Sequence, residues 1–317
     1  MTGSSEFSNC VLRWVQNPLP LTERPFLALA QQAGCSEAQA IAVIRRLKEQ
    51  GYIRRYRAQL DYKRLGRVAT LVTASVPAEK LDAVAAAVNA LDGVSHNYLR
   101  NHRFNLWFTC QDESFERIEA TLRTLGQQTG VEFRTLPAQT VYKLDVRFDP
   151  SGPSAEDFLA GQYQPVAEAA GVVELTADQR RALRLLQDDI ALTQSPLSRD
   201  LLKIAQELSD KGVIRRIAAV LDHRKLGYTV NVMLAAVVEN SRMDAAGKAM
   251  ASRPAVSHCY QRKPFAGWPY NLFAMIHAGR MEDVQRFIDG LAKEYRICDY
   301  ALLPTVCEFK KKPVFYV

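Results

Sequence analysis

The sequence lacks the residue patterns that hold most cofactors and protein-bound metals. Its six cysteines stand apart, with no CxxC pair and no spacing typical of a zinc or iron–sulfur site. There is no glycine-rich phosphate loop and no lysine motif for a Schiff base. We therefore expect no organic cofactor and no metal held by the protein itself. Scattered, unpaired thiols are typical of a reduced, cytoplasmic protein.

Long apolar runs are also lacking. The longest nearly apolar stretch, Val230 to Val238, is far shorter than the roughly 20 residues that a membrane-spanning helix needs. No secretory signal is visible, and the serine-rich and glycine-containing start, Met1 to Phe7, is expected to be a frayed end. We predict a cytoplasmic protein without membrane contact.

What the sequence does contain is typical of a globular protein with a basic surface. Its 317 residues predict two or more domains, and 48% hydrophobic with 24% charged residues are enough for a core. The formal net charge of +7 indicates an acidic partner. Nucleic acid, an anionic membrane and a polycarboxylate ligand satisfy this charge equally.

The most informative feature is an internal repeat. Gly51–Arg55 returns as Gly212–Arg216, with four of the five residues identical. Further along, the pattern Val-Ser-His-x-Tyr-x-Arg of Val94–Arg100 returns in Val256–Arg262. These matches stay collinear over about 100 residues, as expected of a tandem duplication.

Each copy is predicted to contain helices followed by a β-α-β-β-α-β unit. In the first copy, apolar spacing predicts helices over 25–32 and 36–50, and Ser36 with Gln39 forms a candidate capping box. A β-rich segment containing 54–60 is expected to be the wing. The remaining predicted strands are 69–76, 94–101, 104–110 and 133–143, then 230–238, 255–263, 270–278 and 298–309; the helices are 79–91 and 114–129, then 243–251 and 282–295.

These elements predict an α+β fold, a tandem repeat of a winged helix-turn-helix plus a ferredoxin-like βαββαβ domain. This architecture resembles that of Lrp/AsnC regulators over nearly the whole chain. The expected parts are a degenerate winged helix-turn-helix (10–66), a first ferredoxin-like domain (67–148), a linker (149–170), a shortened winged helix-turn-helix (171–227) and a second ferredoxin-like domain (228–317).

The helix-turn-helix units are poor candidates for DNA reading. The second copy has a predicted helix at 197–211 and only residues 187–196 before it, so it lacks a positioning helix to dock against phosphates. The reading helix of the first copy opens with Glu37, and its Arg45 and Arg46 come late. We expect no DNA binding. We interpret these arginines as solvated surface charges; the alternatives are contacts with phosphate and contacts with a ligand.

One strand of each copy carries a row of polar side chains. Alternation along 94–101 places His96, Tyr98 and Arg100 on the same face. Because the other face is covered by the unit's own helices, this row is expected to look across a cleft toward the partner sheet. The second copy repeats the row as His258, Tyr260 and Arg262.

Neighbouring residues extend both rows. Aromatic rings beside guanidinium groups suit a flat, polyanionic ligand, because rings stack on its plane while arginine binds carboxylates. Structural packing remains the alternative for each, and it is preferred for His277, whereas His223 is given no role. The candidate ligand contacts are His102, Arg103, Asn105 and Trp107 in the first copy and Lys263, Trp268, Tyr270 and Asn271 in the second.

The segments 94–109 and 257–277 resemble the two halves of siroheme decarboxylases, an Lrp/AsnC-like family, in the fused form. The resemblance implies a carboxy-lyase that removes CO2 from two acetate side chains of siroheme. The product would be 12,18-didecarboxysiroheme, an intermediate in the synthesis of heme d1, which is used in denitrification, or in the alternative route to heme. The substrate then brings its own iron.

We expect His96 and His258 to act as general acids with pKa values near neutrality, assisted by Tyr98 and Tyr260. The arginines Arg100, Arg103 and Arg262 would hold the unreacted carboxylates. A histidine could instead ligate the substrate iron. The alternative functions are a DNA-binding regulator that senses a small ligand or heme, and a non-catalytic heme carrier. Self-association and contact with other heme-pathway proteins stay open.

Overall fold

The computed structural model describes residues 2–166 and 171–315. The first helical unit consists of α1 (Thr2–Val15), α2 (Leu27–Ala33) and α3 (Glu37–Glu49). The predicted capping box at the start of α3 is confirmed, since Ser36 N–H donates to Gln39 Oε1 at 2.9 Å and Ser36 Oγ accepts from the Gln39 N–H at 3.3 Å. The expectation of a frayed start is wrong, because α1 already begins at Thr2.

The second helical unit has two helices, α6 (Ala177–Gln187) and α7 (Arg199–Asp210). Residues 188–198 between them contain no helix. This confirms that the second copy has no counterpart of α2. The linker before α6 contains a short 3-10 helix, η3 (Ala155–Phe158), and its residues 167–170 lie outside the described residues.

The predicted wing is wrong. Strand β1 (Ile53–Leu60) forms no hairpin with its neighbours but pairs antiparallel with β6 (Ile214–Leu221), its counterpart in the second copy. A single strand in each copy leaves its backbone groups unpaired, and pairing with the equivalent strand satisfies both. As a result the two helical units share one hydrophobic core.

Both ferredoxin-like units have the predicted order of elements. The first contains β2 (Val68–Ala74), α4 (Leu81–Asn89), β3 (Val94–Arg100), β4 (Leu106–Asp112), α5 (Phe115–Thr129) and β5 (Phe133–Leu144). The second contains β7 (Val230–Val237), α8 (Asn240–Ala251), β8 (Val256–Arg262), β9 (Leu272–Ala278), α9 (Met281–Tyr295) and β10 (Asp299–Lys311).

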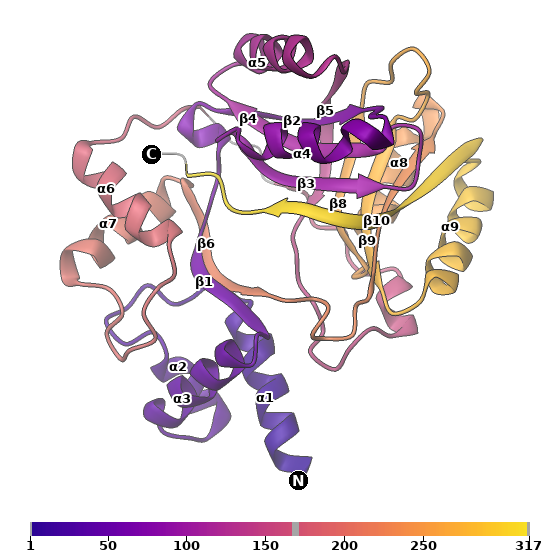
Figure 1. The fold of residues 1–317 in the computed structure, drawn as a ribbon. Coiled ribbons are helices and arrows are strands. Elements are labelled where there is room, and N and C mark those ends of the chain that lie inside the picture. The colour runs from indigo at the N-terminus through magenta and orange to yellow at the C-terminus, as the bar shows by residue number, and fades with distance from the viewer. Residues whose placement is uncertain (1, 167–170, 316–317) are drawn as a thin grey trace.

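The two sheets join into one closed barrel, with strand order β10-β3-β4-β2-β5-β8-β9-β7. The long last strands close it. Residues 133–137 of β5 pair with β2, and 138–144 continue onto β8 of the other copy. Strand β10 does the same between β7 and β3. Helices α4 and α5 lie on one side of this barrel and α9 on another, while β1 and β6 connect it to the helical units (Figure 1).

Three apolar clusters lie in and around the barrel. Two of them pack each sheet against its own helices, and the third lies between the sheets, where Trp107, Leu136, Trp268, Phe273 and Leu303 are buried. The face of each sheet that looks away from its helices is therefore the barrel interior. Among the described helices, none is long and apolar enough to cross a membrane.

Candidate active site

The polar row of the first copy lies on the inner face of β3. Asn97 points the other way, to α4, where its amide donates to Asn89 Oδ1 at 3.1 Å. The alternating residues His96, Tyr98 and Arg100 therefore face the barrel interior. Their side chains are stacked, with 6.1 Å between the ring centres of His96 and Tyr98 and 5.4 Å from the Arg100 guanidinium to the Tyr98 ring.

The row of the second copy has the same geometry on β8. Cys259 points to α8, with its Sγ 3.7 Å from the Gly247 carbonyl oxygen. The ring centres of His258 and Tyr260 are 6.2 Å apart, and the Arg262 guanidinium lies 4.5 Å from the Tyr260 ring. The shared orientation predicted from alternation is confirmed for both rows.

The two rows face each other across the barrel. In the closed strand order, β3 and β8 are separated by three strands on either side, so they occupy opposite walls. The His258 side chain is near enough for its charge to lower the pKa of His96. Trp107 is the cross-strand partner of Tyr98 and lies on the same inner face. Polar side chains of both copies thus line one shared interior.

The expected near-neutral pKa of the histidines is wrong for the unliganded protein. Burial lowers the pKa of His96 to about 3, with contributions from the charges of Lys311, His258 and Arg57. Burial likewise lowers the pKa of His258 to about 4. Both imidazoles are neutral at pH 7, because a desolvated site disfavours the charged form.

The unliganded protein is expected to lose stability as the pH falls from 6.5 toward about 4. The histidine pKa is 6.5 before burial, and the folded values are lower, so the unfolded chain takes up more protons in this window. The stabilisation is complete above pH 6.5 and is lost as the pH falls toward the folded values. Urea unfolding midpoints at pH 7 and pH 5 measure it. The double variant His96→Gln, His258→Gln should show a smaller difference, and an unchanged difference would contradict the assignment.

A serine hydroxyl supports each histidine from the preceding position. Ser95 Oγ lies 2.8 Å from His96 Nδ1 and 2.7 Å from Thr109 Oγ1. Ser257 Oγ lies 2.9 Å from His258 Nδ1 and 2.9 Å from Nε2 of a second histidine, His277. These contacts fix the ring orientation and leave Nε2 of the row histidines as the atom for a substrate.

The arginines of the rows are buried and bind the opposite copy. Arg100 donates to the Leu303 carbonyl at 2.6 Å and to Thr305 Oγ1 at 3.3 Å. Arg262 donates to the Leu136 carbonyl. Burial lowers the pKa of each guanidinium to about 10. Among the described residues, no salt bridge to an acidic group is recorded for either arginine. Both arginines therefore join the two halves of the chain, and the expected contact with carboxylates of a ligand stays a prediction.

Basic side chains surround the histidine end of the barrel. Arg215 of β6 donates to the carbonyl of Leu144 at 2.8 Å, and Leu144 is the cross-strand partner of His258. Lys311 of β10 is the cross-strand partner of His96. Arg54 of β1 is held by Asp222 at 2.8 Å. The pairing of β1 with β6 therefore places cations of both copies beside the histidines, where carboxylates of a ligand would be stabilised.

The helical and the sheet parts of the chain both match known protein families. Residues 9–54 match the siroheme decarboxylase NirDL-like HTH domain, and residues 64–143 and 225–310 match the AsnC-like ligand binding domain. Siroheme decarboxylase of Hydrogenobacter thermophilus is 32% identical over 96% of this chain and 93% of its own length. This chain belongs to the siroheme decarboxylase family.

Two further siroheme decarboxylases are similar over most of the chain. The NirDL subunit from Paracoccus denitrificans is 30% identical, covering 83% of this chain and 82% of that protein. The crystal structure of the siroheme decarboxylase NirDL superposes with a TM-score of 0.72 at 30% identity, covering 98% of this chain and 94% of that one. That decarboxylase has also been solved in complex with an iron-uroporphyrin III analogue.

Residues that sequence analysis added to the rows form a separate loop cluster at the arginine end. His102 packs edge-on against Trp268 at 5.2 Å between ring centres, and Trp268 lies 4.7 Å from Tyr270. Arg103 donates to the Gly267 carbonyl at 2.7 Å. These contacts join the loop after β3 to the loop before β9. The loops lie at the Arg100 end of β3, away from His96. Lys263 is exposed.

Three further candidates belong to the framework in this structure. Asn105 binds both the N–H and the carbonyl of Val76, at 2.9 and 2.8 Å. Asn271 binds Val238 in the same way. Trp107 is 1% exposed, and its indole N–H donates to the Phe104 carbonyl at 2.7 Å. These contacts hold β2, β4, β7 and the adjoining loops, and the expected contact of the three residues with a ligand stays a prediction.

Sequence analysis missed several residues around the rows. The serines were visible as the repeated Ser-His dipeptide, but only the folded strands show that their hydroxyls bind the rings. His277 and His223 were not assigned to the site, yet their ring centres lie 5.4 Å apart and His277 contacts Ser257. No sequence pattern indicated Lys311, because its position beside His96 depends on the pairing between β10 and β3.

Proposed function

We propose that this chain removes CO2 from two acetate side chains of siroheme and yields 12,18-didecarboxysiroheme for heme d1 or heme synthesis. One observation carries the proposal: a member of the siroheme decarboxylase family holds two matched rows of histidine, tyrosine and arginine face to face inside one barrel. The similar NirDL protein crystallised with an iron-uroporphyrin III analogue supports a tetrapyrrole as the ligand class.

Decarboxylation needs a proton donor and a carboxylate that is shielded from water. The C–C bond to the acetate carboxylate breaks, CO2 leaves, and the electron pair is delocalised into the macrocycle. A proton then adds to the methylene carbon, which becomes a methyl group. Buried surroundings favour this step, because they destabilise the carboxylate relative to neutral CO2. We assign the proton to a row histidine, with Tyr98 or Tyr260 beside it, and the unreacted carboxylates to the arginines.

The low histidine pKa values are compatible with this role. A neutral imidazole still has one N–H proton, which it can donate if a second proton reaches its other nitrogen. The negative charge of a bound polycarboxylate favours the uptake of that second proton, because an opposite charge nearby raises a histidine pKa. A neutral imidazole is also the form that binds iron, so one histidine can hold the iron of the substrate while the other supplies the proton.

Anaerobic incubation with siroheme tests the proposal. The product mass should fall by two CO2 per macrocycle, with release of CO2 in the same ratio. Binding of siroheme with no change in mass would identify a carrier and contradict the decarboxylase assignment.

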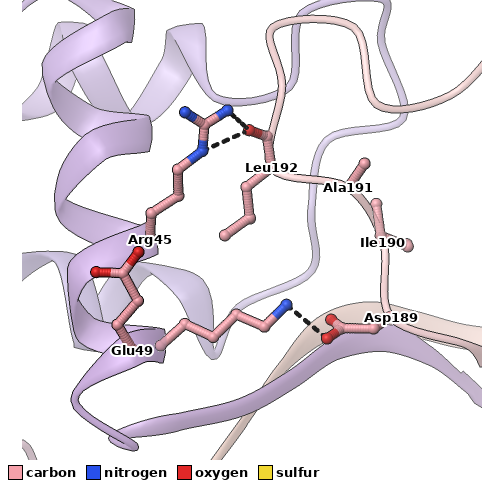
Figure 2. Close-up of a pocket in the computed structure, with 7 residues that line it drawn as sticks. Arg45, Glu49, Asp189, Ile190, Ala191 and Leu192 are labelled. Atoms are coloured by element: carbon pink, nitrogen blue, oxygen red, sulfur yellow. Dashed lines mark hydrogen bonds and ion pairs between the residues drawn. The ribbon is translucent and has the colours of Figure 1, made fainter.

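DNA recognition is disfavoured by the surroundings of α3. Arg45 on this helix donates to the Leu192 carbonyl, with Nε at 3.1 Å, and Lys48 forms an ion pair with Asp189. Figure 2 shows Arg45 directed at Leu192 in the segment 189–192, which follows α6 in the second copy. Two cations of the nominal reading helix are thus engaged within the protein and not available to a phosphate.

We expect no sequence-specific DNA complex at physiological salt. A gel-shift titration with the promoter region of the chain's own gene at two salt concentrations measures this, because phosphate contacts weaken steeply with salt. A specific complex with a nanomolar dissociation constant would favour the regulator instead.

A further inference from the structure

One of the differences between the two copies places a titratable side chain next to a histidine row. Gln111 at the end of β4 pairs with Ala69, and the residue in the equivalent register of the second copy is His277, which pairs with Asn231. The exchange of glutamine for histidine adds a titratable ring behind one row only. His277 lies within hydrogen-bond distance of the Ser257 hydroxyl, which also contacts the row histidine His258.

In the second copy, the row histidine is connected to further histidines. Ser257 Oγ lies 2.9 Å from both His258 Nδ1 and His277 Nε2. The His277 ring lies edge-on to His223 at 5.4 Å between centres. Nδ1 of His277 is buried without a hydrogen-bond partner among the described residues. The charged and titratable groups acting on His277 are His223, His258, Lys311 and Arg100; those on His258 are Arg215, Asp145, Arg262 and Lys143.

In the first copy, the connection ends at hydroxyl groups. His96 Nδ1 contacts Ser95, and Ser95 contacts Thr109 Oγ1 at 2.7 Å. Thr109 does not titrate near neutral pH as a histidine does, so the first copy has no titratable ring behind its serine. The ammonium group that acts on His96, Lys311, is 3.7 Å from Glu308.

We propose that His277 is a proton relay for His258, and that the reacting acetate of the tetrapyrrole is therefore protonated in the second half of the chain. This assignment rests on the proposed decarboxylase function and deepens it. His277 acts through Ser257 and does not touch the substrate, so it is a positioning and proton-relay residue. His96 binds the macrocycle without supplying the proton.

The relay balances without leaving an ion in the barrel. His258 gives its Nε2 proton to the methylene carbon as CO2 leaves, and its Nδ1 takes the proton of the Ser257 hydroxyl. Ser257 takes the Nε2 proton of His277, and His277 Nδ1, which has no hydrogen-bond partner among the described residues, accepts one proton from solvent. One proton enters for each CO2 released. Neutral imidazole suits this exchange, because each ring has one donor and one acceptor nitrogen.

The variant His277→Gln tests the relay, because it installs the residue that the first copy has at this position. Glutamine can still donate to Ser257 but cannot transfer a proton. We expect kcat with siroheme to fall by about 10-fold to 100-fold with an unchanged KM. The solvent deuterium isotope effect on kcat should rise, because proton delivery becomes limiting. Ser257→Ala should give the same changes if His277→Gln proves unstable.

Gln111→Ala in the first half is the matched control and should keep wild-type kcat. An unaltered kcat in both His277→Gln and Ser257→Ala would overturn the relay, as would a higher KM with normal kcat. These outcomes are read against wild-type protein that releases CO2. If the wild-type protein releases none, the proposed function itself fails, so the two failures are distinguishable.

Discussion

Replacing His258 with alanine should lower the turnover of siroheme by about 100-fold or more, the usual contribution of a general acid. The ring is held by Ser257 through Nδ1 and leaves Nε2 toward the barrel interior. Tyr260 is a poor replacement as proton donor, because burial raises its pKa to about 12. Single-turnover rates under anaerobic conditions, followed by product mass, measure the loss.

His96→Ala is the comparison for this variant. The two histidines have the same contacts within their rows, so both variants remove equal volume from equivalent sites. We expect the affinity for siroheme to fall in His96→Ala and the chemical step to fall in His258→Ala. Wild-type turnover in both variants would remove histidine from the chemistry. Melting temperatures of both proteins exclude unfolding as the cause.

Much of the fold was predictable because the chain repeats itself. Periodicity and capping gave the helices and strands of both ferredoxin-like units, and the collinear matches revealed the duplication. The missing counterpart of α2 followed from the short segment between α6 and α7. Each of these features is encoded within a few consecutive residues, where alternation and helix caps leave a local signal.

Features that depend on contacts between the copies were not predictable. Nothing within Ile53–Leu60 indicates that its partner is Ile214–Leu221, because strand propensity does not specify which edge is available. The closure of the barrel by β5 and β10 is of the same kind. A strand of 12 or 13 residues suggests only that it extends beyond its own sheet.

The same distinction between local features and contacts between the copies applies to the candidate site. Alternation placed His96, Tyr98 and Arg100 on one face, and the structure confirms that face. The pKa values could not be read from the sequence, because desolvation depends on how completely the opposite sheet covers the ring. The carbonyl partners of Arg100 and Arg262 lie more than 120 residues away in the chain, in the other copy.

The double variant Arg100→Met, Arg262→Met should lose most of the stabilisation that a tetrapyrrole polycarboxylate gives the wild-type protein. Both guanidinium groups are buried, and Nε of each has no hydrogen-bond partner among the described residues. A hydrogen bond to a charged group contributes about 1.5–3 kcal/mol, so losing one at each arginine weakens binding by about 10-fold to 100-fold per site. Melting temperatures with and without iron uroporphyrin at one fixed concentration measure the effect.

The unliganded variant separates binding from folding. Methionine removes a desolvated charge, which favours the folded state, but it leaves the carbonyls of Leu303 and Leu136 without their donor, which opposes it. These contributions partly cancel, so the melting temperature without ligand should change less than the shift caused by ligand. Arg280→Met, at an exposed pair with Asp283 outside the barrel, is the control. An equal ligand-induced shift in the double variant and the wild-type protein would show that the buried arginines serve only to join the two halves.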